Sequence, residues 1–146
     1  MERKQLIDKL NTNVANLQVL YVKLHNYHWN VRGAQFFSIH QVTESYYDYM
    51  AEQYDAIAER ILQLGAKPLT TLKEYLDNAT LQEEQGKDFE PPYILDRLIE
   101  DFNQLKKDFK EISDLANEIN DQTTVAMADE NVAWLEKAIW MLNASK

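Results

Sequence analysis

The side chains best suited to chemistry in this sequence are metal-binding ones. All three histidines lie in one stretch, HNYHWNVRGAQFFSIHQVTESYYDYMAEQYDAIAERILQLG. Within it, His40 and Glu44 are four residues apart, as are Asp55 and Glu59, and residues 37–64 contain neither Gly nor Pro. This spacing predicts one helix whose two pairs share a face within an arc of roughly 100°. Imidazole and carboxylate ligands without sulfur suit iron, manganese or zinc.

The two pairs are too far apart to hold one ion within a single chain. His40 and Asp55 are separated by about 22 Å along a straight helix that rises 1.5 Å per residue. If two copies of the helix cross antiparallel about a twofold axis near Tyr49 and Met50, the first pair of one copy comes opposite the second pair of the other. Two equivalent mixed sites result, and His28 could complete each of them.

Simpler interpretations compete with a metal site. Two carboxylates four residues apart on a helix usually form a solvated face. A lone histidine in a buried stripe is more often a hydrogen-bonded core residue, and His25, one turn before His28, keeps that interpretation open. The two carboxylate-containing pairs, taken with His28 and His40 on the same inferred surface, favour metal binding.

The elements that position these residues are predicted to be helices only. Apolar residues recur at steps of three or four along most of the chain, with no strand-like alternation. Gly65 and Pro68 end one periodic segment, and Pro91-Pro92 begin another. A long polar crossover between them, carrying a short helix, lets the third long helix run parallel to the second, as in a four-helix bundle with one long connection. The helices are expected at about residues 3–30, 37–64, 71–78, 92–119 and 123–143.

Length and composition limit the function further. The chain has 146 residues, of which 45% are hydrophobic, and it contains three Gly, three Pro and no Cys, which predicts one helical domain without disulfides. The polar start MERKQLIDKL and the absence of any apolar span of membrane length lead us to expect a soluble, cytoplasmic protein. The net charge of -9 disfavours a surface that binds nucleic acid by neutralising phosphates.

The pattern of residues resembles a known family. His-Asn-x-His-Trp-Asn-Val-x-Gly, then Phe-x-x-x-His, then Asp-x-x-Ala-Glu-Arg-Ile and Leu-Gly are similar to the Dps family, the miniferritins called DNA-binding proteins from starved cells. The likeness continues in register to KAIWMLNA near the carboxyl end. It implies a single ferritin-like domain over residues 1–146, a four-helix bundle assembled as a hollow dodecamer, and ferroxidase sites at twofold interfaces.

The resemblance also implies the ligands of those sites. One position departs from the family, because Glu44 stands where aspartate is most common, and a longer carboxylate must be accommodated at the second metal position. The residues that the resemblance implies as metal-binding and catalytic are His28, His40, Glu44, Asp55 and Glu59.

The activity implied by the resemblance is oxidation of Fe(II) by hydrogen peroxide, with oxygen as a slower oxidant, and storage of ferric oxyhydroxide in the cavity. Iron is the implied metal, and zinc or manganese could occupy the same site. Trp29, beside His28, would ordinarily be a packing residue, but next to iron its ring could donate an electron. The family's DNA binders carry an extended basic tail, whereas here the helix pattern begins almost at once and stops just before Lys146. We therefore expect DNA protection without direct DNA binding.

The start of the last helix resembles the family's Asp-x-x-Thr-x-Asp segment, which lines threefold pores for iron entry. Asp121 and Thr124 match, but Ala126 replaces the second aspartate. A pore would therefore use Asp121 with Asp129 or Glu130, one turn further on. An acid at a helix N-terminus is an equally good reason for Asp121.

Two other functions compete with iron oxidation in a Dps-like particle. A larger ferritin or bacterioferritin would place Glu-x-x-His within each subunit, and this spacing does not occur in the sequence. The alternative from a different class is a non-catalytic particle that sequesters metal or associates with DNA, with zinc or iron held structurally at the dimer interface.

Overall fold

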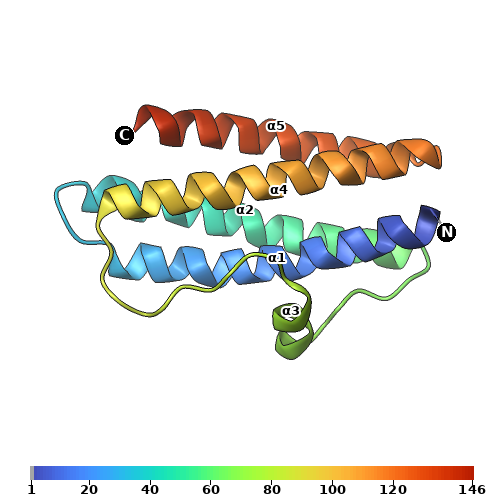
Figure 1. The fold of residues 1–146 in the computed structure, drawn as a ribbon, viewed down its shortest axis with the longest axis horizontal. Helices are drawn as coiled ribbons and strands as arrows, with labels where there is room; N and C mark the ends of the chain where they lie inside the picture. Colours follow the sequence, from blue (N-terminus) through green and yellow to red (C-terminus); the bar gives the residue numbers. More distant parts are fainter. Residues whose placement is uncertain (1) are drawn as a thin grey trace. The chain divides into compact units, whose positions relative to one another are not determined.

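The computed structural model describes residues 2–146 and confirms the all-α organisation expected from the sequence (Figure 1). Each predicted helix begins and ends within one residue of its observed bounds. No helix of residues 2–146 has both the length and the hydropathy needed to cross a bilayer. The helices are α1 (Glu2–Asn30), α2 (Phe36–Gln63), α3 (Leu72–Asn78), α4 (Pro91–Glu118) and α5 (Gln122–Ala144).

Two glycines with positive φ delimit α2. Gly33, at φ 123°, lies in the turn after α1, where an added Cβ would also approach the Pro91 ring to 3.5 Å. Gly65, at φ 86°, follows α2, and its N–H donates to the Leu62 carbonyl at 2.9 Å. Residues with a side chain rarely adopt this left-handed conformation, so the two glycines determine where the helix can begin and end.

Residues 11–94 form one compact unit. Within it, α1 and α2 lie antiparallel, joined by the Gly33 turn (Figure 1). The end of the crossover returns to this turn, where Phe89 and Val31 form an isolated parallel β-bridge and the Arg32 N–H donates to the Phe89 carbonyl at 2.9 Å. The apolar residues that the two helices bury within residues 11–94 are Val14, Ala15, Leu17, Val19, Leu20, Leu24, Tyr27, Ile39, Tyr46, Met50, Ile57 and Ile61.

The short helix α3 is fixed at its start and on one side. Thr71 and Glu74 form a capping box, in which each side chain accepts a bond from the backbone N–H of the other residue. The Tyr75 hydroxyl meets the Tyr54 hydroxyl of α2, and the Asn16 side chain of α1 accepts from the backbone N–H of Thr80 at 2.8 Å. The crossover is therefore tied to both long helices of this unit.

Replacing Tyr75 with Phe is expected to cost roughly 1 kcal/mol, because the Tyr54 hydroxyl loses its partner. Burial, reinforced by the Tyr54 hydroxyl, raises the pKa of Tyr75 above its ordinary value. The unfolded chain releases this proton near pH 10, so the contribution of Tyr75 is complete below about pH 10 and is lost as pH rises toward the folded pKa. Urea denaturation between pH 7 and 11 should show a steeper alkaline loss of stability in the wild type than in Tyr75→Phe. Equal slopes would contradict this assignment.

The second compact unit consists of residues 2–10 and Leu95–Lys146. Within it, α4 and α5 lie antiparallel (Figure 1), and the rings of Phe102 and Trp134 lie with their centroids 5.8 Å apart. The Lys9 ammonium of α1 lies 2.6 Å from the Glu111 carboxylate, which raises the pKa of Lys9. The apolar residues buried on α4 and α5 in this unit are Leu95, Leu98, Phe102, Leu105, Phe109, Ile112, Ala116, Ala128, Leu135, Ala138 and Leu142.

Candidate metal centre

Two of the predicted ligands meet where α1 ends and α2 begins. The rings of His28 and His40 are stacked, with centroids 3.6 Å apart and an interplanar angle of 16°. His28 is almost completely buried, at 5% exposure, whereas His40 is half-buried. The Gly33 turn thus brings together two imidazoles that are twelve residues apart in the sequence.

Each of these histidines is oriented by the backbone of the other. Nδ1 of His28 lies 2.6 Å from the His40 carbonyl oxygen, and Nδ1 of His40 lies 2.8 Å from the His28 carbonyl oxygen. A carbonyl can only accept, so each Nδ1 carries the proton. In a neutral imidazole the lone pair is then on Nε2. Both rings are thereby set to present Nε2 to a metal, the arrangement in which a second hydrogen bond fixes the tautomer of a ligand.

Thr43 completes the orientation of His28, and the sequence alone did not single it out. Its hydroxyl donates to the Ile39 carbonyl at 2.7 Å and lies 3.2 Å from Nδ1 of His28, from which it accepts a second, longer bond. In the sequence it is only a threonine one turn after His40, and its complete burial is seen in the structure. Its role could be identified only once α1 was known to pass beside it.

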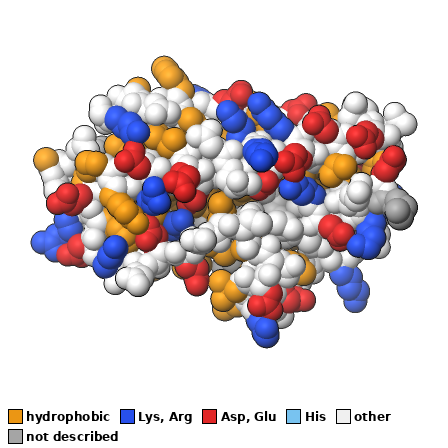
Figure 2. Space-filling view, in the orientation of Figure 1, with side chains coloured by type: hydrophobic (Ala, Val, Ile, Leu, Met, Phe, Trp, Pro, Cys, Tyr) orange, Lys and Arg blue, Asp and Glu red, His pale blue; other side chains and the backbone are white. Residues whose placement is uncertain are grey.

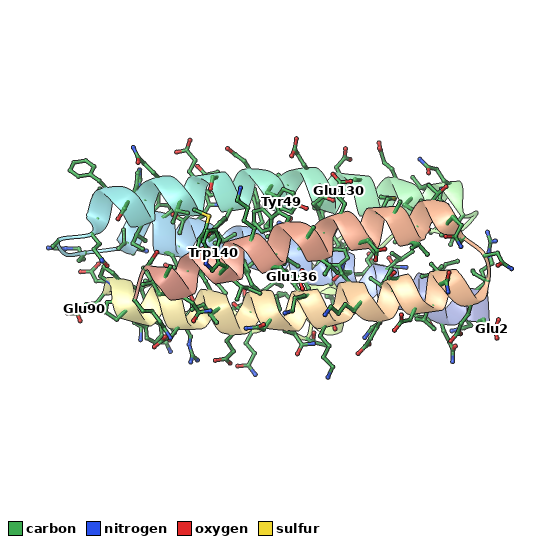
Figure 3. All side chains as sticks on the ribbon, turned by 90° about the horizontal axis from the view of Figure 1, so that it is seen from above. Glu2, Tyr49, Glu90, Glu130, Glu136 and Trp140 are labelled. Carbon is green, nitrogen blue, oxygen red and sulfur yellow. The ribbon has the colours of Figure 1, made fainter. Side chains whose placement is uncertain are left out.

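The three carboxylates of the predicted site lie on the exposed face of α2. Glu44, Asp55 and Glu59 are all exposed and form no hydrogen bond or ion pair within residues 2–146. Figure 3 shows oxygen-tipped side chains along an outer edge of this helix. Two further exposed acids, Asp48 and Glu52, continue the same stripe. Like charges at this spacing repel one another by about 0.2–0.5 kcal/mol per pair, and a bound cation would relieve that repulsion.

A complete site is not assembled by one chain. No group of three or more His, Asp and Glu side chains in residues 2–146 is placed to hold a metal ion. The structure brings His28 and His40 together, with Glu44 one turn further along α2. Asp55 and Glu59 lie far along the same helix, as their spacing in the sequence requires.

An aromatic cluster adjoins the histidine pair. His25 stacks on Tyr47 with centroids 3.7 Å apart, and its Nδ1–H donates to the Tyr21 carbonyl at 2.8 Å. His25 is therefore held as a packing residue. Trp29 is 69% exposed and lies 5.2 Å from His25, centroid to centroid. Tyr47 in turn lies 5.2 Å from the His28 ring, so aromatic contacts connect Trp29 to His28 through His25 and Tyr47.

Charge around Tyr47 favours its neutral form. Partial burial, together with the neighbouring carboxylates of Glu44 and Asp48, raises the pKa of Tyr47. Its phenol therefore keeps its proton at neutral pH and contributes packing area beside the acids without adding negative charge.

Two of the three acids proposed for the pore, Asp121 and Asp129, have structural partners. Asp121 is the N-cap of this helix: it accepts from the Thr124 backbone N–H at 3.1 Å and from the Thr124 hydroxyl at 2.6 Å. Asp129 accepts from the Ser113 hydroxyl at 2.7 Å, whereas Glu130 is exposed. Helix capping thus accounts for Asp121, and the use of these three acids in an iron pore stays a prediction.

Comparison with known proteins gives consistent matches over nearly the whole chain. The model of the ferritin-like domain family matches residues 7–145. A DNA protection during starvation protein of Helicobacter pylori is 44% identical over 130 residues, which cover 89% of this chain and 90% of that protein. The crystal structure of antigen TpF1 from Treponema pallidum superposes with a TM-score of 0.97 at 39% identity, covering 99% of this chain and 92% of that one.

A third match carries a description of its class. The DPS protein from Vibrio cholerae O1, described as a member of a broad superfamily of ferritin-like diiron-carboxylate proteins, superposes with a TM-score of 0.93 at 34% identity, covering 98% of this chain and 89% of that one. The order of the five helices in residues 2–146, together with these matches, defines an all-α, ferritin-like fold, as the sequence predicted. The chain belongs to the Dps family.

Proposed function

We propose that this protein oxidises Fe(II) with hydrogen peroxide at sites shared between two subunits and stores the ferric product. His28, His40 and Glu44 would come from one chain, and Asp55 and Glu59 from its twofold mate. The observation that carries the proposal is the reciprocal hydrogen bonding of His28 and His40, which leaves Nε2 of both rings available as ligands. The diiron-carboxylate description of the Vibrio cholerae relative supports iron as the substrate.

The assembly follows from the same geometry. The α2 spacing requires two chains for each site, and a twofold dimer supplies two equivalent sites. We propose that such dimers close into a hollow dodecamer, in whose cavity ferric oxyhydroxide accumulates, and that the assembly works in the cytoplasm. Membership of the Dps family supports this choice over a simple dimer.

The chemistry needs two ferrous ions for each peroxide. Each Fe(II) gives up one electron, and the peroxide O–O bond is cleaved with uptake of two electrons and two protons, so that two Fe(III) and two water molecules form. Supplying both electrons together avoids the hydroxyl radical that a single electron would produce. Carboxylates neutralise the charge that increases on the metal, and the imidazoles hold the ions in position. Oxygen would serve as a slower oxidant, and zinc or manganese could compete for the same ligands.

Anaerobic titration of the protein with Fe(II) and hydrogen peroxide tests this function. We expect one peroxide to be consumed for every two Fe(II) oxidised, because each site transfers two electrons, and a spin trap should detect little hydroxyl radical. The His28→Ala variant should return the radical yield to that of free iron. Metal binding without peroxide consumption would instead favour the non-catalytic alternative, a particle that holds zinc or iron structurally at its interface.

Protection of DNA would then arise from removal of iron and peroxide, without contact. The net charge is -9, and on the face of residues 2–146 that Figure 2 shows, Lys and Arg side chains are interspersed with Asp and Glu and gather into no basic tract. DNA binding rests on clustered cations that neutralise phosphates, and this acidic protein offers little of that attraction.

A further inference from the structure

The ligand face of α2 is bounded at both ends by an exposed apolar side chain. Phe37 is 78% exposed and Leu62 is 57% exposed, and they are the large apolar residues that α2 leaves exposed among its described residues. Phe37 lies three residues before His40, and Leu62 lies three residues after Glu59. At 100° per residue both fall within the arc of roughly 100° that the ligands occupy.

These two residues fit the same twofold register as the ligands. The axis passes the midpoint between Tyr49 and Met50, and His40 and Glu59 lie equally many residues from that midpoint, on opposite sides of it. Any two residues so related have numbers that add up to 99. The numbers of Phe37 and Leu62 also add up to 99. Antiparallel pairing that aligns the ligands therefore brings Phe37 of each chain opposite Leu62 of the other. Nothing in the spacing of the ligands alone requires this match.

The match also limits how the two helices cross. Phe37 and Leu62 each lie about 19 Å along the helix from the axis. For helices about 9 Å apart at their crossing, the axes at that point would be about 11 Å apart at a crossing angle of 20° and about 18 Å apart at 50°. Side chains of these sizes can meet across the first separation but not across the second. The register thus favours a shallow crossing.

Contacts inside the chain connect Phe37 to the histidines. The Phe37 ring lies edge-on to Phe36, with centroids 5.6 Å apart, and Phe36 is stacked over His40 at 5.1 Å with an angle of 18°. His40 is in turn stacked on His28. An apolar contact at Phe37 would therefore extend a layer of rings that already covers the imidazole pair on one side.

We infer that Phe37 of one subunit packs against Leu62 of its twofold mate, and that the two symmetry-related contacts close the outer ends of the shared metal sites. This inference rests on the proposed function, because the register is set by the ligands that two chains share. The contacts bury apolar surface and restrict access of water beside His40 and Glu59. They make Phe37 and Leu62 positioning residues that act through the alignment of the ligands.

A disulfide test is direct because the protein contains no native cysteine. In the double variant Phe37→Cys, Leu62→Cys, the two positions of one chain are about 37 Å apart along the helix and cannot bond to each other. Across the shallow crossing their Cα atoms would be about 6 Å apart, within disulfide range. On oxidation with diamide, most of the protein should migrate as a dimer on a non-reducing denaturing gel. The matched control Phe37→Cys, Ser45→Cys replaces an exposed residue of the same helix. Its Phe37 and Ser45 positions are out of register by about 26 Å, the two Ser45 positions of a dimer lie about 13 Å apart along the helix, and the control should stay monomeric.

Replacing the apolar pair with a charged pair provides a second test, which requires less exact placement of the two side chains than a disulfide does. Phe37→Asp and Leu62→Lys should each raise the dimer dissociation constant by about a hundredfold, because each places an unpaired charge in both contacts. The combined variant should recover most of that loss, since each aspartate then faces a lysine. Circular dichroism should show unchanged helix content in all three variants.

The outcomes separate this inference from the proposed function. If the disulfide forms in register and the combined charged variant recovers dimer affinity, but the protein does not oxidise iron, the Phe37–Leu62 contact is supported and the proposed ferroxidase activity is overturned. Normal iron oxidation without cross-linking or rescue would overturn the contact and leave the ferroxidase standing. Equal cross-linking in the control would show that the pairing has no defined register and would overturn the inference.

Discussion

Neither Asp55→Ala nor His40→Ala protein should oxidise Fe(II) rapidly, yet co-assembly of the two should restore about a quarter of the wild-type rate. Each variant damages one half of every site and should lose at least about a hundredfold in rate, because a ligand to the reacting metal is missing. In a mixed dimer, one site carries both lesions and the other carries neither. Random pairing makes half of the dimers mixed, so about a quarter of all sites are intact.

A second mixture controls for this prediction. Asp55→Ala and Glu59→Ala damage the same half-site, so their mixed dimers contain no intact site and should show no recovery. Asp48→Ala alters an exposed acid of the same helix face that is not a proposed ligand, and it should oxidise iron at close to the wild-type rate. Subunits should be mixed by co-refolding, and sedimentation should confirm equal particle sizes. Failure of the first mixture to recover, or recovery of both, would contradict sites composed from two chains.

The second large effect is expected in protection of DNA. In a plasmid exposed to Fe(II) and peroxide, the wild-type protein should suppress nicking, and Glu59→Gln should lose most of that suppression. The substitution preserves the size of the side chain but removes the charge of an exposed carboxylate that the proposed site uses to hold iron. Densitometry of supercoiled and nicked plasmid on agarose measures the result.

Gel retardation distinguishes chemical protection from coating of the DNA. At about 0.15 M salt, neither the wild type nor Glu59→Gln should retard the plasmid, because an acidic surface gains little from the phosphates. Glu52→Gln, which changes an exposed acid of the same helix outside the proposed ligand set, should protect as well as the wild type. A retarded band, or full protection by a variant that no longer oxidises iron, would show that coating protects the DNA.

The helices could be predicted closely because their signals are local. Gly65 ends α2 through a left-handed residue, Pro91 occupies the first turn of α4, and Thr71 with Glu74 caps α3. Each signal involves residues within a few positions of the helix end. Periodic apolar residues then identified the buried faces. Most of these residues, such as Leu17, Leu24 and Leu98, are buried, whereas others, such as Val132 and Ile139, are half-buried.

The candidate site could be predicted only in part. The spacing of His40, Glu44, Asp55 and Glu59 depends on one helix, so the sequence was sufficient to place them on one face. The bonds between the His28 and His40 rings and their backbone carbonyls depend on how a turn folds two helices together. The same holds for Thr43 behind His28 and for the stacking of His25 on Tyr47. Pattern alone carries no information about such contacts between helices.

The reciprocal hydrogen bonds between His28 and His40 determine when these two side chains lose their conformational entropy. Immobilising a flexible side chain on binding costs about 0.5–1.5 kcal/mol. For His28 and His40 this cost is met once, when the α1–α2 hairpin folds, and does not recur with each ion that arrives. Glu44, Asp55 and Glu59, exposed and without bonds within residues 2–146, retain their rotamer freedom until a cation orders them. The two imidazoles would then hold fixed positions, while the carboxylates change rotamer to follow an ion whose radius decreases as it is oxidised.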